Sequence, residues 1–130
     1  MDGLKTYTSA FGPKETMDRL EAEVRKKGMT VFARVDHAAG AVEVGLSMRA
    51  TDLLIFGNAR VGTPLMQVEQ TVGLDLPLKI LVWQDAAGHT FCAYYDPHWL
   101  LARHGIVDPA NPSVLAMSAA LAALVNAASV

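Results

Sequence analysis

Short segments rich in β-branched and apolar residues alternate along the chain with segments in which apolar residues recur every three or four positions. The first pattern is typical of strands and the second of amphipathic helices. Strands are predicted at residues 3–10, 29–36, 51–56, 78–84 and 90–95. Helices are predicted at residues 13–27, 64–74, 97–104 and 113–128. Residues 37–49 fit both patterns, because Val42, Val44 and Leu46 alternate whereas the neighbouring alanines favour a helix.

Punctuating residues predict how these elements begin and connect. Thr63 is expected to cap the second helix, with Pro64 at its first position, and Ser113 is expected to cap the last. A four-residue turn at 85–88 joins the last two strands as a hairpin. The first strand, helix and second strand form a candidate right-handed crossover unit.

The resulting order is β-α-β-β-α-β-β-α-α. This order predicts one α+β domain over residues 1–130, with a mixed or antiparallel sheet and helices packed on one side. Within that domain we expect an α+β core at 1–108 and an apolar C-terminal helix at 109–130.

Composition and charge narrow the range of partners. Apolar residues make up 52% of the chain and charged ones 18%, which excludes intrinsic disorder. The 11 Lys+Arg and 13 Asp+Glu give a net charge of −2, so we expect no nucleic-acid partner. A single cysteine and an N-terminus without an apolar stretch predict a cytoplasmic protein.

The C-terminal segment carries no charge from Pro109 to Val130. Alanine dominates this segment, and Pro112 and Ser118 interrupt it, so we expect a helix outside the membrane. Apolar residues on a seam at three- and four-residue steps would face the sheet: Val114, Met117, Leu121, Leu124 and Ala128. Because no face is charged, we expect a second copy of the chain to cover the surface around Ala119 and Ala123, giving a homodimer. The alternative is a helix that only covers the sheet of its own chain, with Ser118 and Asn126 as its polar face.

Residues 57–64 lie between a predicted strand and a predicted helix, where phosphate-binding loops are found. The two glycines have the spacing of a nucleotide-binding loop. However, Thr63 stands where the phosphate-binding lysine would be, and Pro64 where the magnesium-binding hydroxyl would be. Two interpretations stay open: a weaker anion site that uses Arg60 and free backbone N–H groups, and a purely structural turn.

Two ionisable residues are candidates for a ligand site. His37 follows a strand end, where it either contacts a ligand or hydrogen-bonds the backbone and holds its loop. Lys79 lies in an otherwise apolar strand, where it either extends to the edge of the sheet or pairs inside a pocket. The four-residue turn would place Lys79 opposite Tyr94.

The sequence predicts no metal and no cofactor. The candidate ligands lack the close spacing of metal sites: His37, His89, Cys92, His98 and His104. Cys92 is expected to be a small core residue, and no nucleophile elbow is present.

Several phrases resemble the domain-of-unknown-function family 302, found in bacteria and archaea. They are Asp36-His37-Ala38, residues 54–58, Gly62-Thr63, residues 75–79 and Tyr95. Ala59 stands where the family pattern usually has proline. The resemblance implies a compact α+β fold that often pairs as a dimer, and it implies no activity.

Three functional hypotheses follow. The first is a cytoplasmic homodimer that binds a small anionic ligand with His37, Asn58, Thr63 and Lys79, with Arg60 at the rim of the pocket. The second is an enzyme in which His37 is the general acid/base and Lys79 stabilises an oxyanion. The third is a protein-interaction module that uses the apolar C-terminal helix. Convergence of His37 and Lys79 would favour the enzyme.

Overall fold

The computed structural model describes residues 1–130 and contains one five-stranded sheet. Every neighbouring pair of strands is antiparallel, in the order β1-β5-β4-β3-β2. The strands are β1 (Leu4–Ser9), β2 (Thr30–Asp36), β3 (Thr51–Gly57), β4 (Leu78–Gln84) and β5 (Thr90–Tyr95). The helices are α1 (Pro13–Lys26), α2 (His37–Glu43), α3 (Ala59–Val68), the 3₁₀ helix η1 (Gln70–Leu74), α4 (Pro97–Ala102) and α5 (Pro112–Ser129). The α+β prediction is confirmed.

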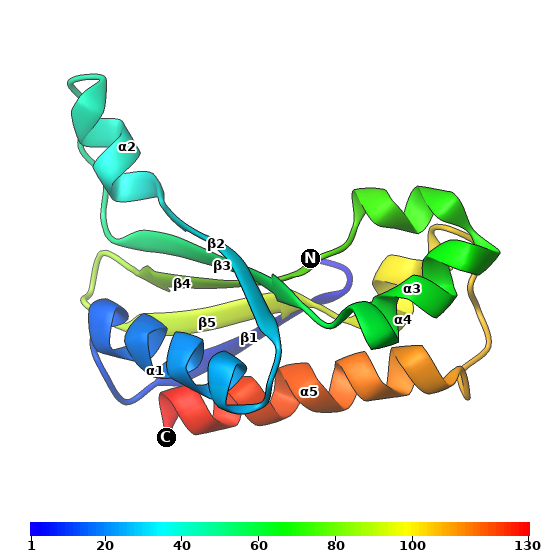
Figure 1. Ribbon diagram of the computed structural model, residues 1–130. Helices are drawn as coiled ribbons and strands as arrows, with labels where there is room; N and C mark the ends of the chain where they lie inside the picture. Colours follow the sequence, from blue (N-terminus) through cyan, green and yellow to red (C-terminus); the bar gives the residue numbers. More distant parts are fainter.

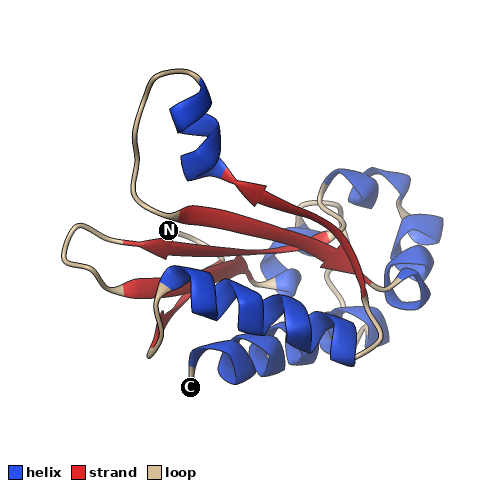
Figure 2. Cartoon of the chain, turned by 60° about the vertical axis from the view of Figure 1, so that its left-hand side comes forward, coloured by secondary structure: helices blue, strands red, loops and turns tan.

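One face of the sheet is covered by α1 and α5, which lie side by side beneath it (Figures 1 and 2). Alternate residues of the central strands point toward these helices, among them Leu54, Ile80 and Cys92, which are fully buried. They meet Leu20 of α1 and Leu124 of α5 within a cluster of 19 buried residues. This cluster is the hydrophobic core, and it lies on that face.

The opposite face of the sheet has no helix packed across it (Figures 1 and 2). By strand alternation and register, its positions on β3, β4 and β5 are mostly apolar. They are Thr51, Leu53, Ile55, Lys79, Leu81, Trp83, Phe91, Ala93 and Tyr95. We call this surface the open face. Trp83 and Phe91 stack on it with ring centroids 5.4 Å apart.

The helix α1 connects the two edges of the sheet. The strand before it, β1, is one edge strand, and the strand after it, β2, is the other, with three antiparallel strands between them. The expected crossover therefore exists, but it joins strands that are not neighbours. The residue pattern within each strand could not reveal the order of the strands, because the residues that pair with β1 lie far along the chain, at 90–95.

The ambiguous segment forms a helix followed by an extended return. Asp36 caps α2, its carboxylate accepting a hydrogen bond from Ala39 N at 2.9 Å. Gly45, with φ of 79°, ends the helix, and residues 44–50 lead back to β3. We call residues 37–50 the arm, because they project from the end of the sheet on the open-face side (Figures 1 and 2).

Two helix starts differ from the predictions. Asn58, not Thr63, caps α3, and its side-chain oxygen accepts from Arg60 N at 3.0 Å. Pro64 consequently lies inside α3. Asn111, not Ser113, caps α5, with Pro112 at the first position. In both cases an asparagine, which caps a helix as well as serine or threonine does, comes before the residue that was predicted as the cap.

The β4–β5 hairpin is also shifted by one residue from the prediction. Gln84 pairs with Thr90, so the loop contains five residues rather than four. Asp85 N donates to His89 O at 2.9 Å, and Gly88 takes a φ of 88° inside the loop. As a result, Lys79 does not pair with Tyr94, and Leu81 lies opposite Ala93.

Candidate functional site

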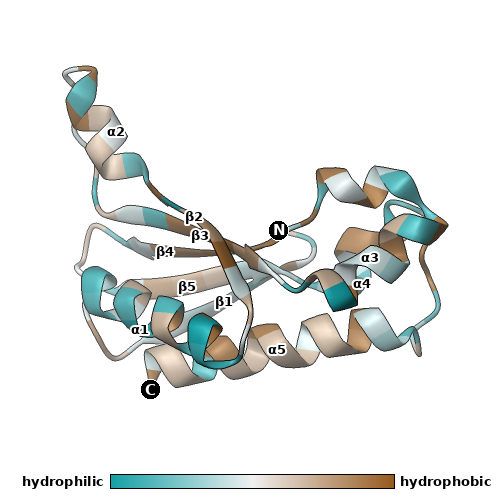
Figure 3. Cartoon of the chain, in the orientation of Figure 1, coloured by the Kyte–Doolittle hydropathy of each residue, from teal (hydrophilic) through white to brown (hydrophobic).

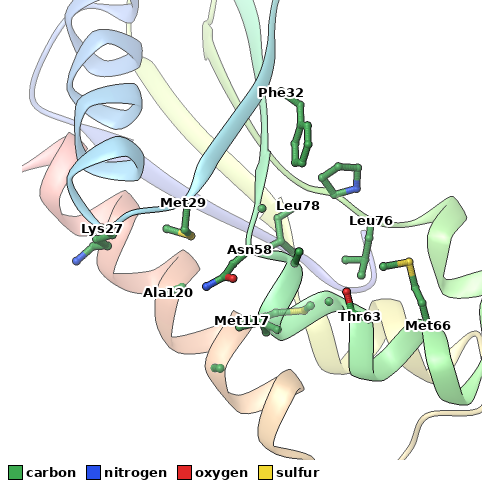
Figure 4. Close-up of a pocket in the computed structure, with 16 residues that line it drawn as sticks. Lys27, Met29, Phe32, Asn58, Thr63, Met66, Leu76, Leu78, Met117 and Ala120 are labelled. Carbon is green, nitrogen blue, oxygen red and sulfur yellow. The ribbon is translucent and has the colours of Figure 1, made fainter.

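A pocket of about 510 Å³ lies where β3 ends and α3 begins (Figure 4). Ten of its sixteen lining residues are hydrophobic, a lining that is common among small-molecule pockets. Met29, Phe32, Met66, Leu76 and Met117 supply the largest of these side chains. Three methionines from separate segments make the wall adaptable, because the thioether side chain is flexible and polarisable.

The close approach of α3 to the segment before β4 shapes one wall of the pocket. A Cβ added to Gly62 would lie 3.3 Å from Leu76 Cδ1, which is tighter than ordinary contact. Gly62 is buried in α3, and both residues line the pocket. The glycine therefore lets the helix and the Leu76 side chain enclose this side of the cavity.

Three polar side chains line the pocket from the side of α1 and α3: Lys27, Asn58 and Thr63. Lys27 follows α1, and its ammonium is the charged group among the lining residues. Asn58 uses its oxygen to cap α3, and its amide nitrogen points toward the Lys27 and Ala120 side (Figure 4). Lys27 and the Asn58 amide are both hydrogen-bond donors, so this rim suits a polar or anionic group.

Of the five residues expected at the site, the structure places two in this pocket, Asn58 and Thr63. Arg60 is exposed on the first turn of α3 and does not line it. The anion site expected at this helix start also loses donors. Arg60 N bonds the Asn58 side chain, and the next two N–H groups bond the Asn58 carbonyl, each at 3.0 Å.

The ionisable pair expected at the site is separated. Lys79 is exposed on the open face beside the pocket, and its Nζ donates to Pro77 O at 3.2 Å. His37 begins the exposed helix α2, beyond the pairing of Asp36 with Asp52. Lys79 pairs with Ile55, which lies three residues further along β3 than Asp52. Since a strand rises about 3.3 Å per residue, about 10 Å of strand or more separates His37 from Lys79. His37 and Lys79 do not converge.

Cys92 lies on the buried face of β5. Burial raises the pKa of its thiol from 9.0 to about 11, so the thiol stays protonated near neutral pH. This agrees with the expectation of a core residue and removes the side chain from the candidates for a nucleophile.

A cluster of polar side chains connects η1 to the end of α4, and the sequence did not reveal it. His104, only 10% exposed, contacts Asp75 through Nε2 at 2.5 Å and Thr71 Oγ1 through Nδ1 at 2.9 Å. Thr71 Oγ1 donates to Glu69 Oε1 at 2.9 Å, and Arg103 lies 3.8 Å from Asp75. These contacts attach η1 to the end of α4. Asp75, which takes part in them, directly precedes Leu76 of the pocket wall.

Sequence reasoning missed most of the pocket. Lys27, Met29, Met66 and Met117 come from four separate segments, and nothing in their local pattern marks them as neighbours. The one available signal was the count of six methionines in 130 residues.

Comparison with known families agrees with the fold. The profile described as Domain of unknown function DUF302 matches residues 5–124. A crystal structure of an uncharacterized conserved DUF302 protein from Bacillus stearothermophilus superimposes with a TM-score of 0.85, covering 98% of this chain and 99% of that one, at 24% identity. The chain belongs to the DUF302 family, which confirms the resemblance seen in its sequence.

Curated relatives include two proteins named "Fluoride-specific ion channel FluC 1", from Brucella suis biovar 1 (strain 1330) and Brucella abortus biovar 1 (strain 9-941). Each is 44% identical to this chain over 115 residues. The match covers 88% of this chain but 45% and 43% of the two relatives. The chain therefore spans less than half the length of the curated relatives it matches.

Proposed function

We propose that this protein binds a small molecule with a largely apolar body and one anionic or strongly polar end. The observation that carries the proposal is the pocket of about 510 Å³ at the start of α3, with hydrophobic walls and Lys27 on its rim. Pockets of roughly 300–1,000 Å³ with a few placed polar groups are typical of small-molecule sites.

The polar rim supports an anionic end. Lys27 supplies a positive charge. The side-chain amide of Asn58, which caps α3 through its oxygen, supplies a hydrogen-bond donor through its nitrogen (Figure 4). The apolar body would contact the three methionine side chains and Phe32. This proposal keeps Asn58 and Thr63 from the sequence prediction and replaces His37, Arg60 and Lys79 by Lys27 and the apolar wall.

The other two hypotheses receive less support. An enzyme that combines His37 with Lys79 needs both side chains at one substrate, but His37 begins α2 beyond the end of β2 whereas Lys79 lies within β4. An interaction module based on α5 needs apolar side chains that point outward. The large side chains of α5 are mostly buried against the body, and its exposed residues are mainly alanines.

The name of the curated relatives does not extend the proposal, because it belongs to proteins more than twice as long as the matched region. By length and composition alone, α5 could cross a membrane, yet seven of its residues are buried within this domain. A cytoplasmic location and a homodimer stay predictions.

The test uses 1-anilinonaphthalene-8-sulfonate, a fluorescent probe with an aromatic body and one sulfonate. Ala116 of α5 lines the pocket and is exposed, so Ala116→Trp fills the cavity without entering the core. We expect this variant to bind the probe at least about 10-fold more weakly, a change of ~1.4 kcal/mol. Ala119→Trp, on an exposed position of the same helix outside the pocket, is the matched control.

A second variant tests the charged rim. Lys27→Ala should weaken binding of the anionic probe roughly 2- to 5-fold, as expected for a solvent-exposed ion pair. Binding of the neutral probe N-phenyl-1-naphthylamine should not change. Equal probe affinity in wild type, Ala116→Trp and Ala119→Trp would show that the probe binds elsewhere and would refute the proposed site.

A further inference from the structure

We propose that the apolar body of the ligand is a flat aromatic ring system, and that Phe32 is the residue that selects it. The proposal rests on the proposed function, because it narrows the ligand of the same pocket to the class of aromatic acids. Its starting point is a local irregularity of β2 that the residue pattern of the strand does not show.

Phe32 occupies a β-bulge in β2. The residues on either side of it pair with two consecutive residues of β3, so Phe32 itself has no partner across the ladder. A bulge redirects the side chain of the extra residue, and bulges are common beside binding sites. Figure 4 shows the Phe32 ring pointing from β2 toward Leu76 and Leu78 of the pocket. The bulge therefore brings an aromatic ring to the pocket from an edge strand.

The Phe32 ring is placed where a ligand can stack on it. A Cβ added to Gly57 would lie 3.5 Å from Cε2 of Phe32 and 3.5 Å from Cβ of Pro77, so both side chains lie beside the bare backbone of Gly57. Nevertheless, 60% of Phe32 is exposed. Aromatic rings prefer offset-stacked or edge-to-face contact with other rings. An aromatic ligand would find such a contact on Phe32 and would remove this surface from water.

The methionine side chains favour the same class of ligand. Met29, Met66 and Met117 line the pocket, and thioether sulfur atoms make favourable contacts with aromatic rings, often at the ring edge. A saturated ring of the same size would keep the hydrophobic contact. It would lose both the stacking on Phe32 and the sulfur–aromatic contacts.

Small residues complete the wall of the pocket on the two helices. The helix α3 contributes Ala59 and Gly62, and α5 contributes Ala116 and Ala120. Figure 3 shows α5 in pale shades over much of its length, because alanine dominates this helix. Such short side chains leave a wall of low relief. A flat ring packs against a wall of this kind more closely than a puckered one does.

Lys27 determines the polar end of the ligand. It is the charged group among the lining residues, and Figure 4 shows it on the α1 side of the pocket, away from Phe32. A ring that stacks on Phe32 leaves its acidic substituent free to approach Lys27. Stacking on one side and positive charge on the other define an aromatic carboxylate or sulfonate as the ligand.

The experiment compares two acids with the same carbon skeleton, 2-naphthoate and its saturated form decahydro-2-naphthoate. Their binding to the full-length chain is measured by isothermal titration calorimetry. Phe32→Leu keeps an exposed apolar side chain but removes the ring. This variant should bind 2-naphthoate roughly 3- to 10-fold more weakly than the wild type, and the affinity for the saturated acid should change less than about 2-fold.

Two further variants control for the loss of the ring. Phe32→Tyr keeps an aromatic ring and should bind 2-naphthoate within about 2-fold of the wild type. Tyr95→Leu removes an exposed aromatic residue outside the pocket and should leave both affinities unchanged. If Phe32→Leu changed both affinities equally, or changed neither, the proposed selection of aromatic acids would be overturned.

Ala116→Trp separates this proposal from the proposed function. If it weakens binding of both acids while Phe32→Leu does not discriminate between them, the pocket binds ligands but Phe32 does not select aromatic ones. If Ala116→Trp leaves both affinities unchanged, the acids bind elsewhere and both proposals fail. A wild type that binds neither acid also contradicts both.

Discussion

Segments of the chain extend beyond the sheet at both of its ends, but the contacts that hold these two segments differ. At one end, α3 and η1 are bound to the body by the His104 cluster and by the contact between Gly62 and Leu76. At the other end, the arm has its own N-cap at Asp36 and buries no residue of α2.

This contrast separates two ways of using an exposed segment. An end that is fixed by internal contacts can position a cavity, because the walls keep their places when a ligand enters. An end that lacks such contacts gains little stability from its exposed apolar residues, because they stay in contact with water. The pocket lies at the first end and the exposed arm at the second.

The largest loss of stability is expected from removing the His104 contacts that hold η1. His104→Ala removes the contacts to Asp75 and Thr71 and leaves the mostly buried Asp75 with Arg103 alone, 3.8 Å away. Leaving such a group unpaired costs roughly 1–3 kcal/mol. Urea denaturation should show this loss, and probe binding in the pocket should weaken with it.

His89→Ala is the control for that variant. His89 is exposed in the β4–β5 loop, so its removal should change the unfolding free energy by less than about 0.5 kcal/mol. If both variants unfolded at the same urea concentration as the wild type, the His104 cluster would not fix η1.

An intermediate effect concerns the strand at the base of the arm. Arg34 of β2 bonds Asp18 of α1 at 2.7 Å and Asp52 of β3 at 2.9 Å. Hydrogen bonds from Lys14 and then from Arg34 hold the pKa of Asp18 below its ordinary value of 3.8. The stabilisation is therefore present above that value and is lost as the pH falls through the lowered pKa.

The measurement is the urea midpoint of wild type and Asp18→Asn at a series of pH values. The wild type should be the more stable at neutral pH, and the difference should shrink below the ordinary pKa of 3.8. Asp2→Asn, at an exposed carboxylate near the N-terminus, serves as the control and should show no such trend. A difference that grew on acidification would contradict the assignment.

The smallest effect is expected at the free end. Replacing Val42 or Val44 of the arm by serine should change the unfolding free energy of the monomer by less than about 0.5 kcal/mol, because both side chains are already exposed. The measurement is urea denaturation of the wild type and of both variants. A large loss in the monomer would mean that the arm packs on its own body.

Local patterns predicted the elements well and their ends less well. The strands at 78–84 and 90–95 were predicted with the observed bounds, because alternation is a property of neighbouring residues. The starts of α3 and α5 were placed too late, since Asn58 and Asn111 cap these helices ahead of the Thr-Pro and Ser signals. The hairpin register depended on one loop residue, His89, which no pattern assigns.

The candidate site was predicted less well, for a different reason. Asn58 and Thr63 were found because they belong to one loop with a recognisable motif. Lys27 and Met117 join them only because α1 and α5 pack together beneath the sheet, which is a long-range property. His37 was predicted at the site because histidine can act as an acid or a base near neutral pH. Its actual position at the base of the arm depends on the pairing of β2 with β3, which is not visible in the local pattern.

The pairing of β1 with β5 sets the order in which the chain can acquire its structure. Leu4 lies opposite Tyr95, so β1 can pair only when β5, far along the chain, is available. The β4–β5 hairpin closes through a five-residue loop, whereas α3 and η1 separate β3 from β4 along the chain. We therefore expect the β4–β5 hairpin to form before β1 joins the sheet.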